Sequence, residues 1–260
     1  MIYEELITVA EKYPDKKSIN DISFNELIKL LDTISYELII DDIDHWVIIK
    51  ILKALKENKP VIVRPKYNRN NIELPNNLNN TFSLNMYTSG SSSTIRKSIP
   101  LSEKLIHTNA KNNIRLLNLR PNDIMYNVSS LNHTGGINTI TLSGLLNGNT
   151  VICEQFNAFN FFRKTVELSA TITHLVPGQV DMLMKVHRNF QTPLRLVFSG
   201  SDCISRIQAE YFLNNRIDFF QGYGMTEAGP PAIYHYWSPG DNLTILDKGV
   251  MLGDNCLCDY

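Results

Sequence analysis

The stretch Ile172–Phe198, ITHLVPGQVDMLMKVHRNFQTPLRLVF, decides the fold class because it places a helical pattern between two strand-like runs. Residues 172–176 and 194–198 are rich in apolar and β-branched side chains, whereas residues 177–188 have the pattern of a helix. A strand, a helix and a second strand in this order are typical of parallel strands joined by a crossover helix.

The same alternation continues on both sides of this stretch. We therefore predict an α/β protein with mixed, largely parallel sheets and helices packed on both faces. Ligands of such sheets bind beyond the carboxyl ends of the strands, so the loops that follow strands are the candidate sites. The further strand-like runs are residues 123–128, 150–153 and 217–220, and the further helical patterns are residues 102–117, 135–146, 159–169 and 205–214.

Toward the N-terminus the pattern is mainly helical. Ser23 is the expected N-cap of one helix, because Glu26 follows three residues later as in a capping box. The expected elements are helices at residues 3–12, 23–36 and 45–55, a strand at 60–64 and an Asn-rich loop at 66–85.

The composition is that of an ordinary globular protein: of 260 residues, 43% are hydrophobic and 20% are charged. This balance excludes global disorder, which combines low hydrophobicity with high net charge. The net charge of −1 argues against nucleic acid as the main partner, since neutralising phosphates takes a surplus of Lys and Arg. No apolar run reaches the roughly 20 residues that a membrane span needs, so we expect none.

Targeting and redox signals are weak. The N-terminal MIYEELITVAEKYP lacks the basic and then apolar layout of a signal peptide. The pair Cys256 and Cys258 could bind a metal or oxidise, but two thiols cannot complete a zinc site. We expect these two, Cys153 and Cys203 to be reduced thiols in a cytoplasmic protein.

Four segments could carry chemistry, and the first is Asn85–Ile99, NMYTSGSSSTIRKSI. Hydroxyl side chains around one glycine, followed by two cations, suit a loop that holds phosphates. The segment lacks the GxxxxGK[ST] pattern of a P-loop. A solvated Ser/Thr linker is an equally good interpretation of this segment alone.

The second segment is Phe219–Pro230, FFQGYGMTEAGP, directly after a predicted strand. Tyr223 could stack on a flat base, and Thr226 could reach a phosphate. Glu227 supplies the hard oxygen ligand that Mg²⁺ prefers. The alternative is a Gly-rich turn with a surface glutamate.

The third and fourth segments are Asn127–Ile137, NVSSLNHTGGI, and Leu194–Cys203, LRLVFSGSDC. His133 precedes two glycines that let a ligand or another chain come close, although a lone histidine is more often structural. The fourth segment is either a buried strand with a tight turn or a ligand contact. The remaining histidines have no partner motif and receive no role: His107, His174, His187 and His235.

In this order the segments resemble the adenylate-forming (AMP-forming) superfamily of acyl- and aryl-CoA synthetases, peptide-synthetase adenylation domains and luciferases. YTSGSSS (87–93) is similar to the signature YTSG[ST][ST]GxPKG, and residues 222–227 match GYGxTE in full. HTGGINTITLSGLLNGNTVI (133–152) resembles the HxGGL…LLxGxxVV stretch of the CoA-ligase branch, and LRLVFSGSDCIS (194–205) resembles LRxxxxGGAPLS. SFNELIKLLDTISYEL (23–38) and ILKALKENKPVIVRP (51–65) resemble the family's early helix and its LKAGAAYVPL region.

The resemblance implies a role for each matched residue. Lys97 would assist the phosphate loop, His133 would lie near the carboxylate, Thr226 would contact the α-phosphate and Glu227 would hold Mg²⁺. The residues that would wrap the β- and γ-phosphates of ATP are Thr88, Ser89, Gly90, Ser91, Ser92 and Ser93, and those around the adenine are Gly200, Ser201, Gly222, Tyr223, Gly224 and Met225.

The chain departs from the family pattern in several places. Ser93 replaces the second glycine of the phosphate loop, and Arg96 and Lys97 both remain candidates for its cation, with Lys97 preferred. The YRTGD segment and the small C-terminal lid domain are missing. We therefore expect residues 1–260 to form a truncated N-terminal core, with subregions 1–85 and 86–260.

The implied activity is ATP- and Mg²⁺-dependent activation of a small carboxylic acid to an acyl-adenylate, with release of pyrophosphate. The acceptor would be coenzyme A or the thiol of a carrier protein. Two alternatives stay open: a catalytically incomplete nucleotide- or acyl-binding protein, and half of a split ligase whose lid is a separate polypeptide.

Overall fold

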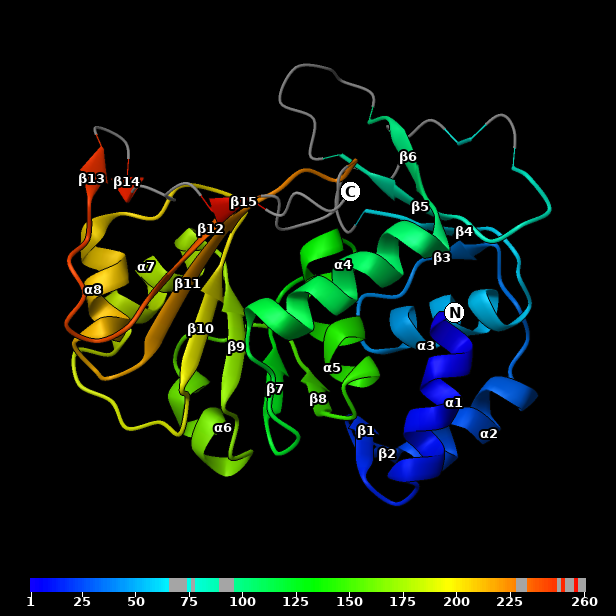
Figure 1. The fold of residues 1–260 in the computed structure, drawn as a ribbon, viewed down its shortest axis with the longest axis horizontal. Coiled ribbons are helices and arrows are strands. Elements are labelled where there is room, and N and C mark those ends of the chain that lie inside the picture. The colour runs from blue at the N-terminus through cyan, green and yellow to red at the C-terminus, as the bar shows by residue number, and fades with distance from the viewer. Residues whose placement is uncertain are drawn as a thin grey trace.

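The protein is seen in a computed structural model that describes residues 1–65, 74–75, 78–88, 96–227, 233–246, 249–250 and 255–256. Its larger sheet has nine strands, in the order β15-β12-β11-β10-β9-β7-β8-β1-β2 (Figure 1). The six central strands, β11, β10, β9, β7, β8 and β1, are parallel to one another. At the two sides of the sheet, β2 pairs antiparallel with β1, β12 with β11, and β15 with β12. The strands are β1 (Lys17–Ile19), β2 (Ile22–Ser23), β7 (Ile124–Asn127), β8 (Thr150–Cys153), β9 (Ile172–Leu175), β10 (Leu196–Ser199), β11 (Asp218–Tyr223), β12 (Ile233–Trp237) and β15 (Asn255–Cys256).

The smaller sheet has four strands in the order β3-β4-β5-β6, of which β3, β4 and β5 are parallel and β6 is antiparallel. These strands are β3 (Ile39–Ile40), β4 (Val61–Val63), β5 (Leu84–Tyr87) and β6 (Ser98–Leu101), and a separate hairpin pairs β13 (Ile245–Leu246) with β14 (Gly249–Val250). Because Tyr87 pairs with Ser98, β5 and β6 form a hairpin whose paired ends flank the Ser-rich segment.

Helices cover both faces of the larger sheet, as the sequence predicts. In β10, Leu196 and Phe198 join one hydrophobic cluster, and Val197 between them joins the other, because successive side chains of a strand point to opposite faces. The helical elements are α1 (Ile2–Lys12), α2 (Phe24–Thr33), α3 (Trp46–Lys56), α4 (Glu103–Leu116), η1 (Gly135–Leu142), α5 (Ser143–Leu146), α6 (Phe161–Glu167), α7 (Pro177–Val186) and α8 (Arg206–Leu213).

The predicted capping box at the start of α2 is confirmed. The Ser23 hydroxyl accepts a hydrogen bond from the Glu26 N–H at 3.2 Å, and the Glu26 carboxylate accepts one from the Ser23 N–H at 2.8 Å. These bonds satisfy backbone donors that would otherwise lack partners at the helix start.

The segment predicted as helical over residues 135–146 is helical, and it begins with a π-helix, η1, that continues into α5. The Gly136 carbonyl accepts a hydrogen bond from the Thr141 hydroxyl at 2.8 Å, and the Asn138 carbonyl accepts one from the Ser143 hydroxyl at 2.7 Å. Both hydroxyls lie five residues after their acceptors, which is the spacing of a π-helix. Asn127 of β7 also donates to the Gly136 carbonyl, at 2.9 Å.

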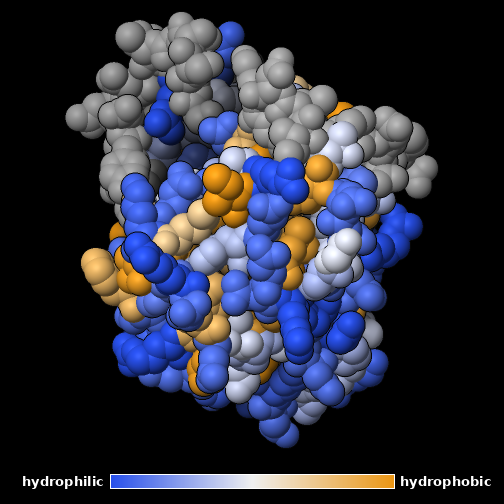
Figure 2. All heavy atoms as spheres, turned by 90° about the vertical axis from the view of Figure 1, so that its left-hand side faces the viewer, coloured by the Kyte–Doolittle hydropathy of each residue, from blue (hydrophilic) through white to orange (hydrophobic). Residues whose placement is uncertain are grey.

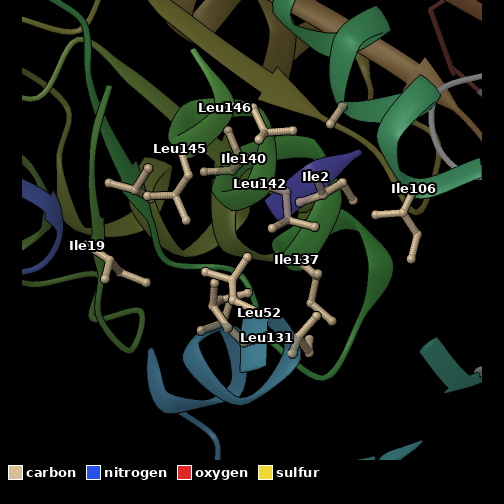
Figure 3. Packing of buried hydrophobic residues seen from close by; sticks show 14 of the residues in the cluster. Ile2, Ile19, Leu52, Ile106, Leu131, Ile137, Ile140, Leu142, Leu145 and Leu146 are labelled. Carbon is tan, nitrogen blue, oxygen red and sulfur yellow. The ribbon is translucent and has the colours of Figure 1, made fainter. Parts of the chain in front are cut away.

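The π-helix is held in the larger hydrophobic cluster. Ile137 and Ile140 from η1 lie near Ile2 of α1, Leu52 of α3 and Ile106 of α4 (Figure 3). The same cluster contains residues of both sheets, so the two sheets share one core. Burial of these side chains stabilises the position of η1 beside the sheet.

The surface is mainly polar on the side where α8 lies in Figure 1. Figure 2 shows that side, with apolar residues as separate spots among hydrophilic ones. Exposed apolar side chains of the protein include Met182 of α7 and Ile207 of α8, and isolated ones are common on protein surfaces. In the ranges that the structure describes, no helix has both the length and the apolar character to cross a membrane.

Gly136→Ala should destabilise the protein, whereas Gly178→Ala should not. A Cβ on Gly136 would lie 2.3 Å from the Ser130 carbonyl oxygen, while one on Gly178 in α7 would meet nothing within 4 Å. We expect a loss of about 2 kcal/mol or more in the free energy of unfolding for the first. The second should gain up to about 1 kcal/mol because alanine favours helix. Urea unfolding measures both, and equal effects would contradict the close contact at Gly136.

Candidate active site

The strands β7, β8, β9, β10 and β11 are parallel, so the loops that follow them lie together at the carboxyl ends of the strands. By the edge of the larger sheet we mean this side, beyond the carboxyl ends of its parallel strands. A cavity of about 430 Å³ opens at this edge. Ser129 and Ser130 line it after β7, and Glu154 lines it after β8. His133, Arg96, Gln155 and Gln179 add further polar groups to its lining.

Asn127 holds the loop of this cavity in place. Its side-chain oxygen accepts a hydrogen bond from the Ser129 N–H at 2.9 Å, and its amide donates to the Thr141 hydroxyl at 2.8 Å. Asn132 attaches the same loop to the smaller sheet by donating to the carbonyls of Asp42 at 3.2 Å and Arg64 at 2.7 Å. The cavity therefore has a wall fixed by both sheets.

His133, which the sequence singles out, lies in this cavity together with Arg96. Desolvation by the surrounding protein lowers the pKa of His133, and the positive charge of Arg96 lowers it further. His133 is therefore neutral at pH 7, and Arg96 carries the positive charge of the cavity.

The two candidate cations of the phosphate loop point to different places. Arg96 lines the cavity of His133, whereas Lys97 lines a second cavity of about 570 Å³ with Asn85 and Pro100. Adjacent residues of an extended chain point to opposite sides, which explains the separation. Thr88 lies at the base of the hairpin, where its backbone N–H donates a hydrogen bond to the carbonyl oxygen of Lys97, with a distance of 3.4 Å from nitrogen to oxygen. The predicted phosphate-loop residues Ser89, Gly90, Ser91, Ser92 and Ser93 lie outside the described residues.

The expected adenine-facing residues gather at the ends of two neighbouring strands. The sequence ends the last strand at Phe220, but β11 continues through Gly222 and Tyr223 because β12 pairs with it there. Gly200 follows β10, and a Cβ on it would lie 3.1 Å from the Gly222 carbonyl oxygen, so the close approach of the two backbones favours glycine. Next to it, Ser201 has a φ of 74°, a strained conformation for a residue with a side chain.

Tyr223 exposes 53% of its surface at this edge, so its ring is accessible for stacking. Gly224 and Met225 follow it on the surface, Thr226 is half-buried and Glu227 is exposed. Among the residues with described side chains, no three His, Cys, Asp or Glu form a metal-binding group. The Glu227 carboxylate alone could hold Mg²⁺ when substrate phosphates provide further ligands.

His174 is a residue of this edge that sequence reasoning missed. It is only 3% exposed, and the Ser129 hydroxyl contacts its Nδ1. Burial lowers its pKa to about 4. The sequence did offer one indication of this position. His174 lies near the end of a predicted parallel strand, just before Val176 and Pro177, and the carboxyl ends of such strands are where ligands bind.

The buried His174 should make stability depend on pH. An unfolded chain protonates its histidine near pH 6.5, whereas the buried ring stays neutral down to about pH 4. The unfolded state therefore binds more protons in this window, and stability falls as the pH falls. We expect His174 to contribute a loss of up to about 3 kcal/mol between pH 7 and pH 4. Urea unfolding of wild type and His174→Phe measures it, and parallel pH curves would contradict it.

Solved structures of adenylate-forming enzymes share this fold. The o-succinylbenzoate CoA synthetase (MenE) of Bacillus subtilis, in complex with its acyl-adenylate intermediate OSB-AMP, superposes with a TM-score of 0.72 and 13% identity, over 90% of this chain and 77% of that chain. The N-terminal domain of FACL13 from Mycobacterium tuberculosis gives a TM-score of 0.69 and 15% identity, over 90% of this chain and 78% of that one.

Sequence comparison points the same way. Indoleacetate–CoA ligase of Aromatoleum aromaticum is 31% identical over 153 residues, which are 57% of this chain and 30% of the relative. The aligned part thus spans less than a third of that ligase. A profile of the AMP-binding enzyme family matches residues 15–253. The chain therefore belongs to the AMP-binding enzyme family, and its fold is that of the adenylate-forming enzymes.

Proposed function

We propose that the protein activates a small carboxylic acid with ATP, giving an acyl-adenylate and pyrophosphate. The observation that carries the proposal is the cavity of His133 and Arg96, which lies on the sheet edge where Gly200, Gly222 and Tyr223 also lie. One cation, one neutral imidazole and an accessible aromatic ring suit two anionic substrates that meet beside a purine base.

In this reaction a carboxylate oxygen attacks the α-phosphorus of ATP, and the bond to the pyrophosphate oxygen breaks. The step needs positioning and charge neutralisation rather than a nucleophilic side chain. Arg96 takes the role of the phosphate cation in our proposal, since it shares the cavity with His133. The neutral His133 orients the carboxylate, and Thr226 contacts the α-phosphate.

The other nucleotide contacts follow the family resemblance. Tyr223 stacks on the adenine opposite Gly200 and Ser201, with Gly222, Gly224 and Met225 beside them. The loop that starts at Thr88 and continues through Ser93 wraps the β- and γ-phosphates. Glu227 holds Mg²⁺, which supplies positive charge for the departing pyrophosphate when it is bound.

The similarity to indoleacetate–CoA ligase makes indole-3-acetate the first acid to test, and coenzyme A or a carrier-protein thiol the acceptor to test. We also propose a cytoplasmic location, which the unpaired Cys153 and Cys203 support. Residues 1–260 are proposed to act as the N-terminal core, with a lid domain supplied by another segment or polypeptide.

Acid-dependent pyrophosphate exchange tests the function. We expect labelled pyrophosphate to enter ATP only when Mg²⁺ and a carboxylic acid such as indole-3-acetate are both present. If exchange needs a separately produced lid domain, the split-ligase alternative holds. If ATP binds but no acid supports exchange even with that domain, the protein is the alternative, a nucleotide- or acyl-binding relative.

Arg96→Ala should lower the exchange rate far more than Lys97→Ala. Removing the only cation that lines the described part of the His133 cavity should cost about 100-fold, as when one charge-stabilising donor is lost. Lys97 lines the other cavity, so its loss should cost less than about threefold. The reverse order would assign the phosphate contact to Lys97.

Glu227→Ala should raise the Mg²⁺ concentration needed for half-maximal exchange. The change removes one ligand oxygen from a metal that otherwise binds through phosphates and water. Glu210→Ala is the control, because that half-buried carboxylate already pairs with Arg206 on α8. An unchanged Mg²⁺ requirement in Glu227→Ala would rule out Glu227 as the ligand.

A further inference from the structure

Arg96 and His133, which share one cavity, come from different sheets. Arg96 lies two residues before β6, and β6 pairs with β5 of the smaller sheet. His133 belongs to the loop that follows β7 of the larger sheet. The distance between the guanidinium and the imidazole is therefore set by the way in which the two sheets are joined.

The side-chain amide of Asn132 makes a direct polar link between the sheets at this point. Asn132 immediately precedes His133 and is only 3% exposed. Its Nδ2 donates to the carbonyl oxygens of Asp42, at 3.2 Å, and of Arg64, at 2.7 Å. Arg64 directly follows β4, and Asp42 lies two residues after β3. The amide thus binds the carboxyl ends of two neighbouring parallel strands of the smaller sheet.

Only one orientation of the Asn132 amide fits this place. Both of its partners are carbonyl oxygens, which can only accept a hydrogen bond, so the NH₂ group must face them. Its Oδ1 is buried and has no hydrogen-bond partner among the residues that the structure describes. A buried acceptor without a partner lowers stability, so a side chain selected for stability alone would avoid it.

The shared hydrophobic core also joins the sheets, but it fixes their relative position less sharply. Leu131, next to Asn132, packs in the cluster that contains residues of both sheets. Burial of apolar surface is non-directional, whereas a hydrogen bond depends steeply on distance and angle. Two hydrogen bonds from one amide to two strands therefore define a position. This precision matters, because a displacement of about 1 Å between reacting groups can cost about 100-fold in rate.

We propose that Asn132 is a positioning residue for the activation reaction. Its amide holds the smaller sheet so that Arg96 stays at the distance from His133 at which the α-phosphate and the carboxylate meet. The inference rests on the proposed function, because this distance matters only if both side chains bind substrates in the cavity. Asn132 is not among the described residues that line the cavity, so it acts through the other two side chains.

Asn132→Ala tests the inference against a matched control, Asn149→Ala. Asn149 is also buried, and its Nδ2 also donates to two backbone carbonyls, those of Arg120 at 2.7 Å and Asp123 at 3.0 Å. It lies just before β8, at the amino end of that strand and away from the candidate site. After correction for the folded fraction measured by circular dichroism, Asn132→Ala should lower the maximal rate of pyrophosphate exchange about 10- to 100-fold. Asn149→Ala should lower it less than about threefold.

Two further measurements separate positioning from a purely structural role. The ATP concentration for half-maximal exchange should change less than about threefold in Asn132→Ala, because Gly200 and Tyr223 belong to the larger sheet together with His133. In an Arg96→Ala background, Asn132→Ala should cost less than about threefold more, because no guanidinium remains to be positioned. A purely structural effect would multiply with that of Arg96→Ala.

Asn132→Ser is the milder variant that decides the question if Asn132→Ala does not fold. A hydroxyl has one proton and cannot donate to both carbonyls, so the link between the sheets is still weakened. The corrected exchange rate should fall about tenfold, again with less than about a threefold change in the ATP requirement. A wild-type rate in Asn132→Ser would overturn the inference.

The failure of the inference can be distinguished from the failure of the proposed function. Equal corrected rates of Asn132→Ala and Asn149→Ala, or full additivity with Arg96→Ala, would overturn the positioning role while wild-type exchange leaves the proposed function intact. If the wild type neither binds ATP nor exchanges pyrophosphate with any acid tested, the proposed function fails and the inference fails with it.

Discussion

The amide of Asn127 connects the parts on which the candidate site depends. It is buried at the end of β7, and it bonds the backbone of Ser129, the carbonyl of Gly136 and the hydroxyl of Thr141. One side chain thereby fixes the loop that carries His133 and the first turn of the π-helix. Its donors and its acceptor are all used, so replacing it would leave several buried groups without partners.

The electrostatics of the site follow from this arrangement. His133 and His174 both have lowered pKa values because the protein excludes water from them, and His133 also faces Arg96. At neutral pH the cavity therefore presents the Arg96 guanidinium, the uncharged imidazole of His133 and the Glu154 carboxylate, which pairs with Lys164 at 3.3 Å. Such a set can bind an anion through Arg96 and orient it through the neutral His133.

Much of the fold was predictable from the sequence. The runs 150–153 and 172–176 became β8 and β9 with almost no change, because buried parallel strands are short apolar runs between helices. The sequence did not predict β1, β2 and β3. Each has only two or three residues, which is too few to show the alternation of apolar and polar side chains that marks a strand. The π-helical form was missed because a run of apolar residues does not distinguish the five-residue hydrogen-bond spacing of a π-helix from the four-residue spacing of an α-helix.

The motifs in the sequence predicted which segments form the candidate site, but they did not predict the direction in which individual side chains point. The sequence placed His133 and the GYGMTE segment at strand ends, and the structure puts them there. It could not tell which side of the hairpin Arg96 and Lys97 face, because that depends on the β5–β6 register. It gave His174 no role, because the Ser129 contact joins residues 45 positions apart.

A crystal structure of the chain with the acylsulfamoyl-adenosine analogue of indole-3-acetate would test the account most directly. We predict that the adenine stacks on Tyr223 and that the sulfamate lies between Arg96 and His133. A ligand bound instead in the cavity of Lys97, or a sulfamate that contacts neither Arg96 nor His133, would contradict this account of the site.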